Sequence, residues 1–227
     1  MARHAKLISV RLMKGLRVFC ADIGSVSAGK FGWAAADVDG QVRESGSDIR
    51  ELARSAASHL NSGAPTSLGF ECPLFVPLRE DPNRLTKARK GDGSRAWSAG
   101  AGTGALATGL VEVSWILRDV RRELRREVAC HLDWKTFDSS GGLFLWEAFV
   151  SGEAKPQVEG NPHAADAMAA VEAFVDALPD PTSMNAIEES DVISLVGMAL
   201  LRTGWTRDVE SLERPCLVIK PSARDDA

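Results

Sequence analysis

Two acidic residues lie where apolar stretches of the sequence end, and their carboxylates could take part in catalysis or bind a metal ion. Asp22 closes the run LRVFCAD, and Ile-Gly and a small polar turn follow it. Glu71 lies in SLGFECPL, two residues before Pro73. An unpaired buried carboxylate is costly, so each needs a partner, a metal ion or a place at the rim of a sheet. Because proline cannot donate a ladder hydrogen bond, the second strand should end near Glu71, which puts that acid at a rim too.

Each of these acids also has a purely structural interpretation. Asp22 could be a turn former, since aspartate accepts backbone hydrogen bonds well. Glu71 could form an ion pair with an arginine such as Arg79. Acids with perturbed ionisation cluster at functional sites, and on that ground we take Asp22 and Glu71 as candidate site residues.

A third carboxylate could come from either of two predicted helices. At the head of 191–201, Asp191 falls on the same side as Leu195 and would face inward, although an aspartate there is also a good N-cap. Within 162–178, Asp166 lies opposite most of the apolar stripe, which predicts a solvated position. We therefore expect Asp191 to be the third acid, with Asp166 as the alternative.

Three carboxylates at one rim would repel one another, and divalent cations would make such a cluster tolerable. Mg²⁺ prefers oxygen ligands and keeps waters and substrate phosphates in its shell. Two such ions about 4 Å apart can activate a water and stabilise the leaving oxygen of a phosphodiester. Asp22, Glu71 and Asp191 are thus predicted to hold Mg²⁺ or Mn²⁺.

The elements that must position these acids follow from the hydrophobic pattern. Consecutive strands joined by tight turns predict an antiparallel meander, and later strand–helix alternation predicts parallel crossovers. The result is an α/β fold: a ribonuclease H-like mixed β-sheet, antiparallel meander plus parallel strands, with helices on both faces. The expected strands are 16–24, 30–38, 41–43, 67–74, 142–150 and 216–219, and the expected helices are 48–60, one from 104 onward, 162–178 and 191–201.

Composition excludes several classes of protein. Of the 227 residues, 44% are hydrophobic and 26% charged, which excludes a disordered chain or a coiled-coil rod. No apolar run is long enough for a membrane span, and 1–15 reads as a basic arm rather than a signal peptide. The four cysteines are widely spaced without a CxxC pair, which indicates free thiols and a cytoplasmic protein. We expect one domain over 16–227, with a long loop at about 76–103.

Four other features have less specific interpretations. The glycines of 99–104 precede a predicted helix and could cradle a phosphate, but they lack the Lys-Ser/Thr of a P-loop. The arginines of 118–126 alternate with acids, which is typical of a solvated helix face. The loop KARKGDGSR is more densely basic and is the better candidate for phosphate contacts. His163, at a helix start, is expected to be structural or solvent-facing.

Several segments together resemble the DUF429 group of predicted ribonuclease H-like nucleases. VFCADIGSVSAGKFGWAAADVDG is similar to the group's opening strand pair, and GFECPLFVP to its acid-x-Pro-Leu strand, with Glu71 in place of the usual Asp. LFLWEAFVSG resembles its Glu-Val-Tyr-Pro strand, with Glu147 as the Glu but without the Tyr-Pro. SDVISLVGMALLRTGW resembles its Asp-x-x-Asp-Ala helix, with Asp191 as the first Asp and Ser194 in place of the second.

The resemblance implies a metal-dependent nuclease acting on RNA or DNA. Asp22, Glu71 and Asp191 would be the catalytic and metal-ligating residues, with Mg²⁺ or Mn²⁺ as cofactor. The arginines of one loop, matched here by Arg84, Arg89 and Arg95, would hold substrate phosphates, and Asp92 matches an Asp that the group carries in the same loop.

Two alternatives remain open at the level of sequence. An actin-like nucleotide-binding phosphotransferase would use Asp22-Ile-Gly24 and the glycines of 99–104, and would have no need of Asp191. A catalytically inactive interaction module would keep the fold without the chemistry, and both Ser194 and the net charge of −4 favour it slightly.

Overall fold

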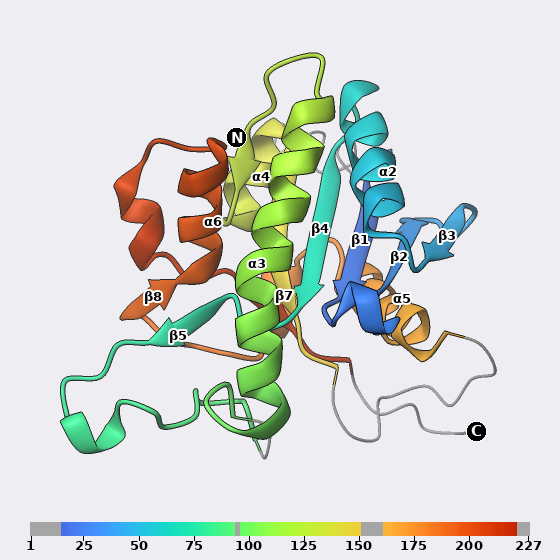
Figure 1. Ribbon diagram of the computed structural model, residues 1–227. Coiled ribbons are helices and arrows are strands. Elements are labelled where there is room, and N and C mark those ends of the chain that lie inside the picture. The colour runs from blue at the N-terminus through green and yellow to red at the C-terminus, as the bar shows by residue number, and fades with distance from the viewer. Residues whose placement is uncertain (1–14, 94–95, 151–160, 222–227) are drawn as a thin grey trace.

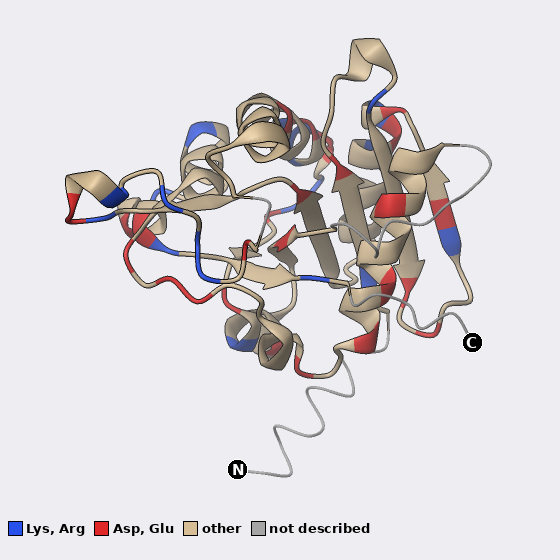
Figure 2. Cartoon of the chain, turned by 90° about the horizontal axis from the view of Figure 1, so that it is seen from below, with Lys and Arg blue, Asp and Glu red and all other residues tan. Residues whose placement is uncertain are grey.

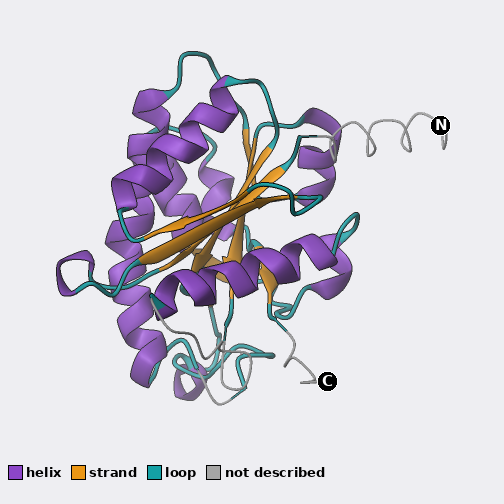
Figure 3. Cartoon of the chain, turned by 90° about the vertical axis from the view of Figure 1, so that its right-hand side faces the viewer, coloured by secondary structure: helices purple, strands orange, loops and turns teal. Residues whose placement is uncertain are grey.

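A mixed β-sheet lies between two layers of helices in the computed structural model, which describes residues 15–93, 96–150 and 161–221 (Figure 1). After a turn of 90° about the vertical axis, the sheet is seen to run through the middle of the molecule with helices on either side (Figure 3). Apart from Gly15, the predicted N-terminal arm lies outside the described residues. None of the helices in the described part of the chain is both long and apolar enough to cross a bilayer.

The strands form one large sheet and a separate two-stranded ribbon. Strand order in the sheet is β3-β2-β1-β4-β7-β6, and β9 also pairs with β7, as β6 does. β1, β2 and β3 make an antiparallel meander, whereas β1, β4 and β7 run parallel. The strands are β1 (Arg17–Asp22), β2 (Gly32–Asp37), β3 (Arg43–Gly46), β4 (Thr66–Glu71), β6 (Cys130–His131), β7 (Leu143–Ala148) and β9 (Leu217–Ile219), with β5 (Phe75–Pro77) and β8 (Val192–Ser194) in the ribbon.

Side-chain alternation along each strand divides the core between the two faces. On β1, Phe19 and Ala21 face the first core, whereas Val18 and Cys20 face the second. The first core packs under α2 (Ile49–Asn61), α3 (Gly100–Glu123) and α6 (Leu195–Thr203), and the second under α4 (Trp134–Ser140) and α5 (Pro162–Asp176). Any polar side chain at a strand end is thus assigned to one helix layer by its parity in the sequence.

The predicted fold class is confirmed, with local differences in the extent of elements. The predicted strand 67–74 ends at Glu71, and its last residues lead into β5. The predicted helix 191–201 is a short strand, β8, followed by α6, because Val192–Ser194 pairs with β5. Helix α3 begins at Gly100 rather than 104, so the glycines of the expected phosphate loop lie in its first turn. The loop predicted at 76–103 also includes part of β5 and a 3-10 helix at Pro82–Arg84.

A glycine lets the first turn of α5 approach β2 closely. A Cβ added at Gly32 would lie 2.3 Å from the backbone nitrogen of Ala164 and 2.4 Å from the backbone carbon of His163. Both atoms belong to the helix backbone, which cannot give way as a flexible side chain would. Gly32 therefore fixes how near the start of α5 lies to the end of β1.

We expect Gly32→Ala to destabilise the protein by about 1–3 kcal/mol, because overpacking forces the backbone to shift. The free energy of unfolding in urea measures the effect. Gly104→Ala is the matched control: a Cβ there meets nothing within 4 Å among the described residues, and alanine favours a helix. Equal stability of the two variants would contradict the close approach of α5.

Candidate metal centre

Two predicted acids lie side by side at the carboxyl ends of neighbouring parallel strands. Asp22 is the last residue of β1, Glu71 is the last residue of β4, and the two are paired in register. Both belong to the sheet face that α5 covers, because Cys20 and Trp146 mark that face and Asp22 continues the alternation of Cys20. Seen from below, acidic segments cap strand ends near the centre of the molecule (Figure 2).

Helix α5 contributes the third carboxylate, Asp166. Single ligand oxygens of Asp22, Glu71 and Asp166 all lie within 4.8 Å of one another. Asp22 and Asp166 are buried and Glu71 is partly buried. An all-oxygen, triply carboxylate set is the kind that hard divalent cations such as Mg²⁺, Mn²⁺ and Ca²⁺ prefer. This cluster, the acid triad, could hold a metal ion.

A histidine holds one member of the acid triad. Nδ1 of His163 lies 2.6 Å from Oδ2 of Asp22, so the ring nitrogen donates to the carboxylate. His163 and Asp166 are three residues apart on α5, and residues at this spacing share one helix face. From the sequence alone, His163 is expected to be structural or solvent-facing. Its spacing to Asp166 is the signal that could link it to the site.

A further acid from the opposite helix layer approaches Asp22. Burial raises the pKa of Glu112 on α3 to about 7; the backbone N–H groups of Gly24 and Val26 oppose this shift, and the charge of Asp22 adds to it. Glu112 thus reaches the loop that follows β1. Sequence reasoning missed it because it lies within a long helix whose apolar stripe gave no sign of a site. The nearest signal is Gly109, where a Cβ would lie 2.5 Å from Sγ of Cys72, so the helix passes close to the strand ends.

The prediction that Asp191 is the third ligand needs correction. Asp191 is exposed, immediately precedes β8, and belongs to the ribbon beside α6 rather than to the group formed by Asp22 and Glu71. Its helix neighbour Val196 packs in the first core, on the sheet face opposite to the one that Asp22 and Glu71 share. The alternative, Asp166, is the acid that the structure brings to them.

The expectation that Asp166 would be solvated was therefore wrong. The predicted apolar stripe relied on large residues such as Met168 and Val175, which are only partly buried. The buried side of α5 includes Ala167 and Ala170, both fully inaccessible, and Asp166 lies on that side. Small alanines bring this helix close to the sheet, and they carry little weight in a stripe drawn from large apolar residues.

Arg89 occupies an interior ion-pair network, which corrects its predicted role as a phosphate ligand. Its guanidinium donates to both oxygens of Glu147 at 2.9 and 2.6 Å, to Asp92 at 3.0 Å and to the carbonyl of Phe75 at 3.2 Å. Burial alone would lower the pKa of Arg89, but the Glu147 and Asp92 carboxylates raise it above its usual range. Glu147 also accepts from the Leu74 backbone N–H. Because Nε, Nη1 and Nη2 of Arg89 all donate to these interior partners, the guanidinium has no nitrogen left to offer a substrate.

The other two predicted phosphate ligands are Arg84 and Arg95. Arg84 is exposed in the 3-10 helix Pro82–Arg84, and Arg95 lies outside the described residues. Arg79, the possible partner of Glu71, instead makes a two-pronged ion pair with Glu189 at 2.9 and 2.6 Å. Glu71 is thus not explained as the partner of that arginine.

Comparisons with models of known protein families, with curated proteins and with solved structures found no match for this chain.

Proposed function

We propose that this protein is a metal-dependent hydrolase of phosphodiesters in nucleic acid. The observation that carries the proposal is the acid triad, with ligand oxygens of Asp22, Glu71 and Asp166 within 4.8 Å of one another at the carboxyl ends of a mixed α/β sheet. In open α/β sheets, ligands bind outside these strand ends. The resemblance to predicted ribonuclease H-like nucleases supports nucleic acid as the substrate class.

The donor set fits Mg²⁺ or Mn²⁺. Mg²⁺ is usually held by one or two carboxylates together with waters and substrate phosphates, so a partly open carboxylate site suits it. When bound, such ions activate a water molecule for attack and stabilise the leaving oxygen of the phosphodiester. Neutral nitrogen and sulfur ligands, which select zinc or copper, are not part of the triad.

In this proposal the residues around the acid triad orient its carboxylates and exchange protons with the site. His163 fixes the carboxylate of Asp22 through a 2.6 Å hydrogen bond, and outer partners of this kind tune metal ligands. Glu112 has a pKa near neutrality, which suits a group that exchanges protons with the site. Exposed cations near the strand ends, such as Lys30 on the loop after β1, would contact substrate phosphates.

The nucleotide-binding phosphotransferase has less support. Its expected phosphate loop, the glycines of 99–104, is already wound into the first turn of α3. The buried carboxylate Asp166 also has no role in that alternative, whereas it completes the triad in ours.

The test is hydrolysis of single- and double-stranded RNA and DNA by the purified chain, with and without Mn²⁺. We expect cleavage that requires Mn²⁺ and that Asp22→Asn reduces by more than about 100-fold, since even the outer partners of metal ligands are worth about 10–100-fold. Asp176→Asn is the matched control, because Asp176 is exposed at the far end of α5.

Two results would overturn the proposal. One is the absence of Mn²⁺-dependent cleavage of every substrate by a folded wild-type chain. The other is cleavage that Asp22→Asn and Asp176→Asn leave equally unchanged, since the activity would then come from elsewhere or from a contaminant.

A further inference from the structure

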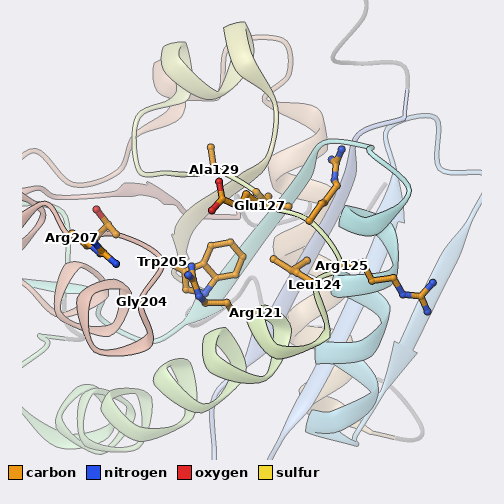
Figure 4. A pocket seen from close by; sticks show the side chains of 11 residues that line it. Arg121, Leu124, Arg125, Glu127, Ala129, Gly204, Trp205 and Arg207 are labelled. Atoms are coloured by element: carbon orange, nitrogen blue, oxygen red, sulfur yellow. The ribbon is translucent and has the colours of Figure 1, made fainter.

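An arginine-lined pocket of about 890 Å³ lies at the opposite end of the sheet from the acid triad. It opens between the end of α3, the segment leading to β6 and the turn after α6 (Figure 4). Cys130 of β6 pairs with Leu143, the first residue of β7, so this pocket adjoins the amino ends of the parallel strands. The acid triad lies at their carboxyl ends, and the two sites are therefore separate.

A second hollow of about 450 Å³ adjoins the first over α2. Arg125 lines both hollows, and Arg54 lines the second. We call the arginines that line the two hollows the arginine track; they are Arg54, Arg121, Arg125, Arg126 and Arg207. The described lining contributes two acids, Glu123 and Glu127, so positive charge dominates.

No acid in the part of the chain that the structure describes neutralises the arginine track. Among the described residues, no carboxylate lies within ion-pair distance of these five guanidinium groups, whereas Arg17, Arg79 and Arg89 elsewhere all pair with acids. Arg121 lies 5.8 Å from the ring centroid of Trp205, whose Nε1 donates to the carbonyl of Leu117 at 2.8 Å. The indole of Trp205, itself held by a hydrogen bond, thus positions the guanidinium of Arg121 without neutralising its charge.

The arrangement fits a chain of phosphates better than a single anion. Figure 4 shows Arg207 and Arg125 on opposite sides of the pocket, with Trp205 and Arg121 between them. In this view Arg207, Arg121 and Arg125 are spread across the pocket rather than converging on one point. Arginine binds phosphate through a planar pair of donors, and a positive groove that follows the backbone is how proteins hold single strands without reading sequence.

We propose that the arginine track binds the phosphate backbone of single-stranded nucleic acid. This site goes beyond the proposed hydrolysis and does not depend on it, since it uses none of the residues of the acid triad. Three residues of the arginine track belong to the run 118–126, whose sequence pattern is typical of a solvated helix face. The other two, Arg54 and Arg207, are distant in the sequence, and only the fold brings them beside that run.

The test is the binding of a fluorescently labelled single strand of about 16 nucleotides, measured by anisotropy in EDTA so that metal-dependent cleavage cannot occur. Between about 50 and 200 mM salt, affinity should fall with salt, since binding releases counterions. The variant Arg125→Glu/Arg207→Glu should bind the strand at least ~10-fold more weakly. The slope of log affinity against log salt concentration should become shallower by about 1.4, since two phosphate contacts are lost.

Arg50→Glu/Lys135→Glu is the control, because it makes the same change in charge at two exposed residues of α2 and α4 that line neither hollow. It should retain wild-type affinity, and the measurement in EDTA separates this binding from the proposed catalysis. Equal affinity of the track variant and the wild type would overturn the proposal. Displacement of the strand by polyglutamate as effectively as by an unlabelled strand would do so too, since it would indicate an acidic protein partner.

Discussion

Asp166→Asn will weaken the binding of Mn²⁺ by more than about 100-fold, since loss of a direct ligand should exceed the roughly 10–100-fold cost of losing an outer partner. The substitution keeps the size of the side chain but removes its charge and one of the three carboxylates whose oxygens lie within 4.8 Å of one another. Titration calorimetry of the folded, metal-free protein measures the affinity directly. It needs no substrate, so the result stands whether or not the protein is a nuclease.

Asp191→Asn is the natural comparison, because it makes the identical chemical change in the acid that sequence reasoning favours. Asp191 is exposed and lies beside the ribbon of β5 and β8, so its removal should leave the affinity for Mn²⁺ within about twofold of the wild type. If Asp191→Asn weakened the binding of Mn²⁺ more than Asp166→Asn does, the metal ion would bind beside Asp191 rather than beside Asp166. That result would contradict the placement of the site. Circular dichroism of both variants checks that the fold is retained.

How far the site could be predicted depended on where each acid lies relative to its own strand. Asp22 and Glu71 each end an apolar run, and a run that ends in a carboxylate indicates a strand that reaches a rim. The meander and parallel crossovers then place both acids at one edge, which the paired register of β1 and β4 confirms. Local pattern was enough here, because the information lies within a few residues of each acid.

The third acid required knowledge of which helix covers which face, and local pattern does not contain it. α5 packs in the second core and α6 in the first, so only α5 meets the face of Asp22 and Glu71. The alternation Phe19/Ala21 against Val18/Cys20 does assign Asp22 to one face. No feature of either helix sequence, however, says which face it will cover.

The basic loop failed as a prediction for a related reason. Arg89 stands in the run KARKGDGSR and has the sequence context of a solvated cation. Its partner Glu147 is 58 positions away and lies one residue before the end of the buried strand β7, on the face opposite the acid triad. An arginine in a polar loop can be judged exposed or interior only when such a distant carboxylate is known to face it.

The second large effect follows from that interior position: Arg89→Met will reduce the free energy of unfolding by about 3–5 kcal/mol. Arg89, Asp92 and Glu147 are all at least 97% inaccessible, with exposed fractions of 3%, 2% and 1%. Methionine preserves much of the volume but leaves two carboxylates in the interior without a counter-charge. Denaturation in guanidinium chloride, followed by circular dichroism, measures the loss.

Two comparisons show whether the loss comes from uncompensated charge rather than from packing. Arg79→Met breaks the ion pair with Glu189, where the two side chains are 21% and 10% exposed, and it should cost about 1 kcal/mol because solvent screens that pair. Adding Glu147→Gln to Arg89→Met should recover part of the stability, since it removes one of the stranded charges. A double variant that is less stable than Arg89→Met would instead mean that Glu147 stabilises the interior through its hydrogen bond from the Leu74 backbone, independently of Arg89.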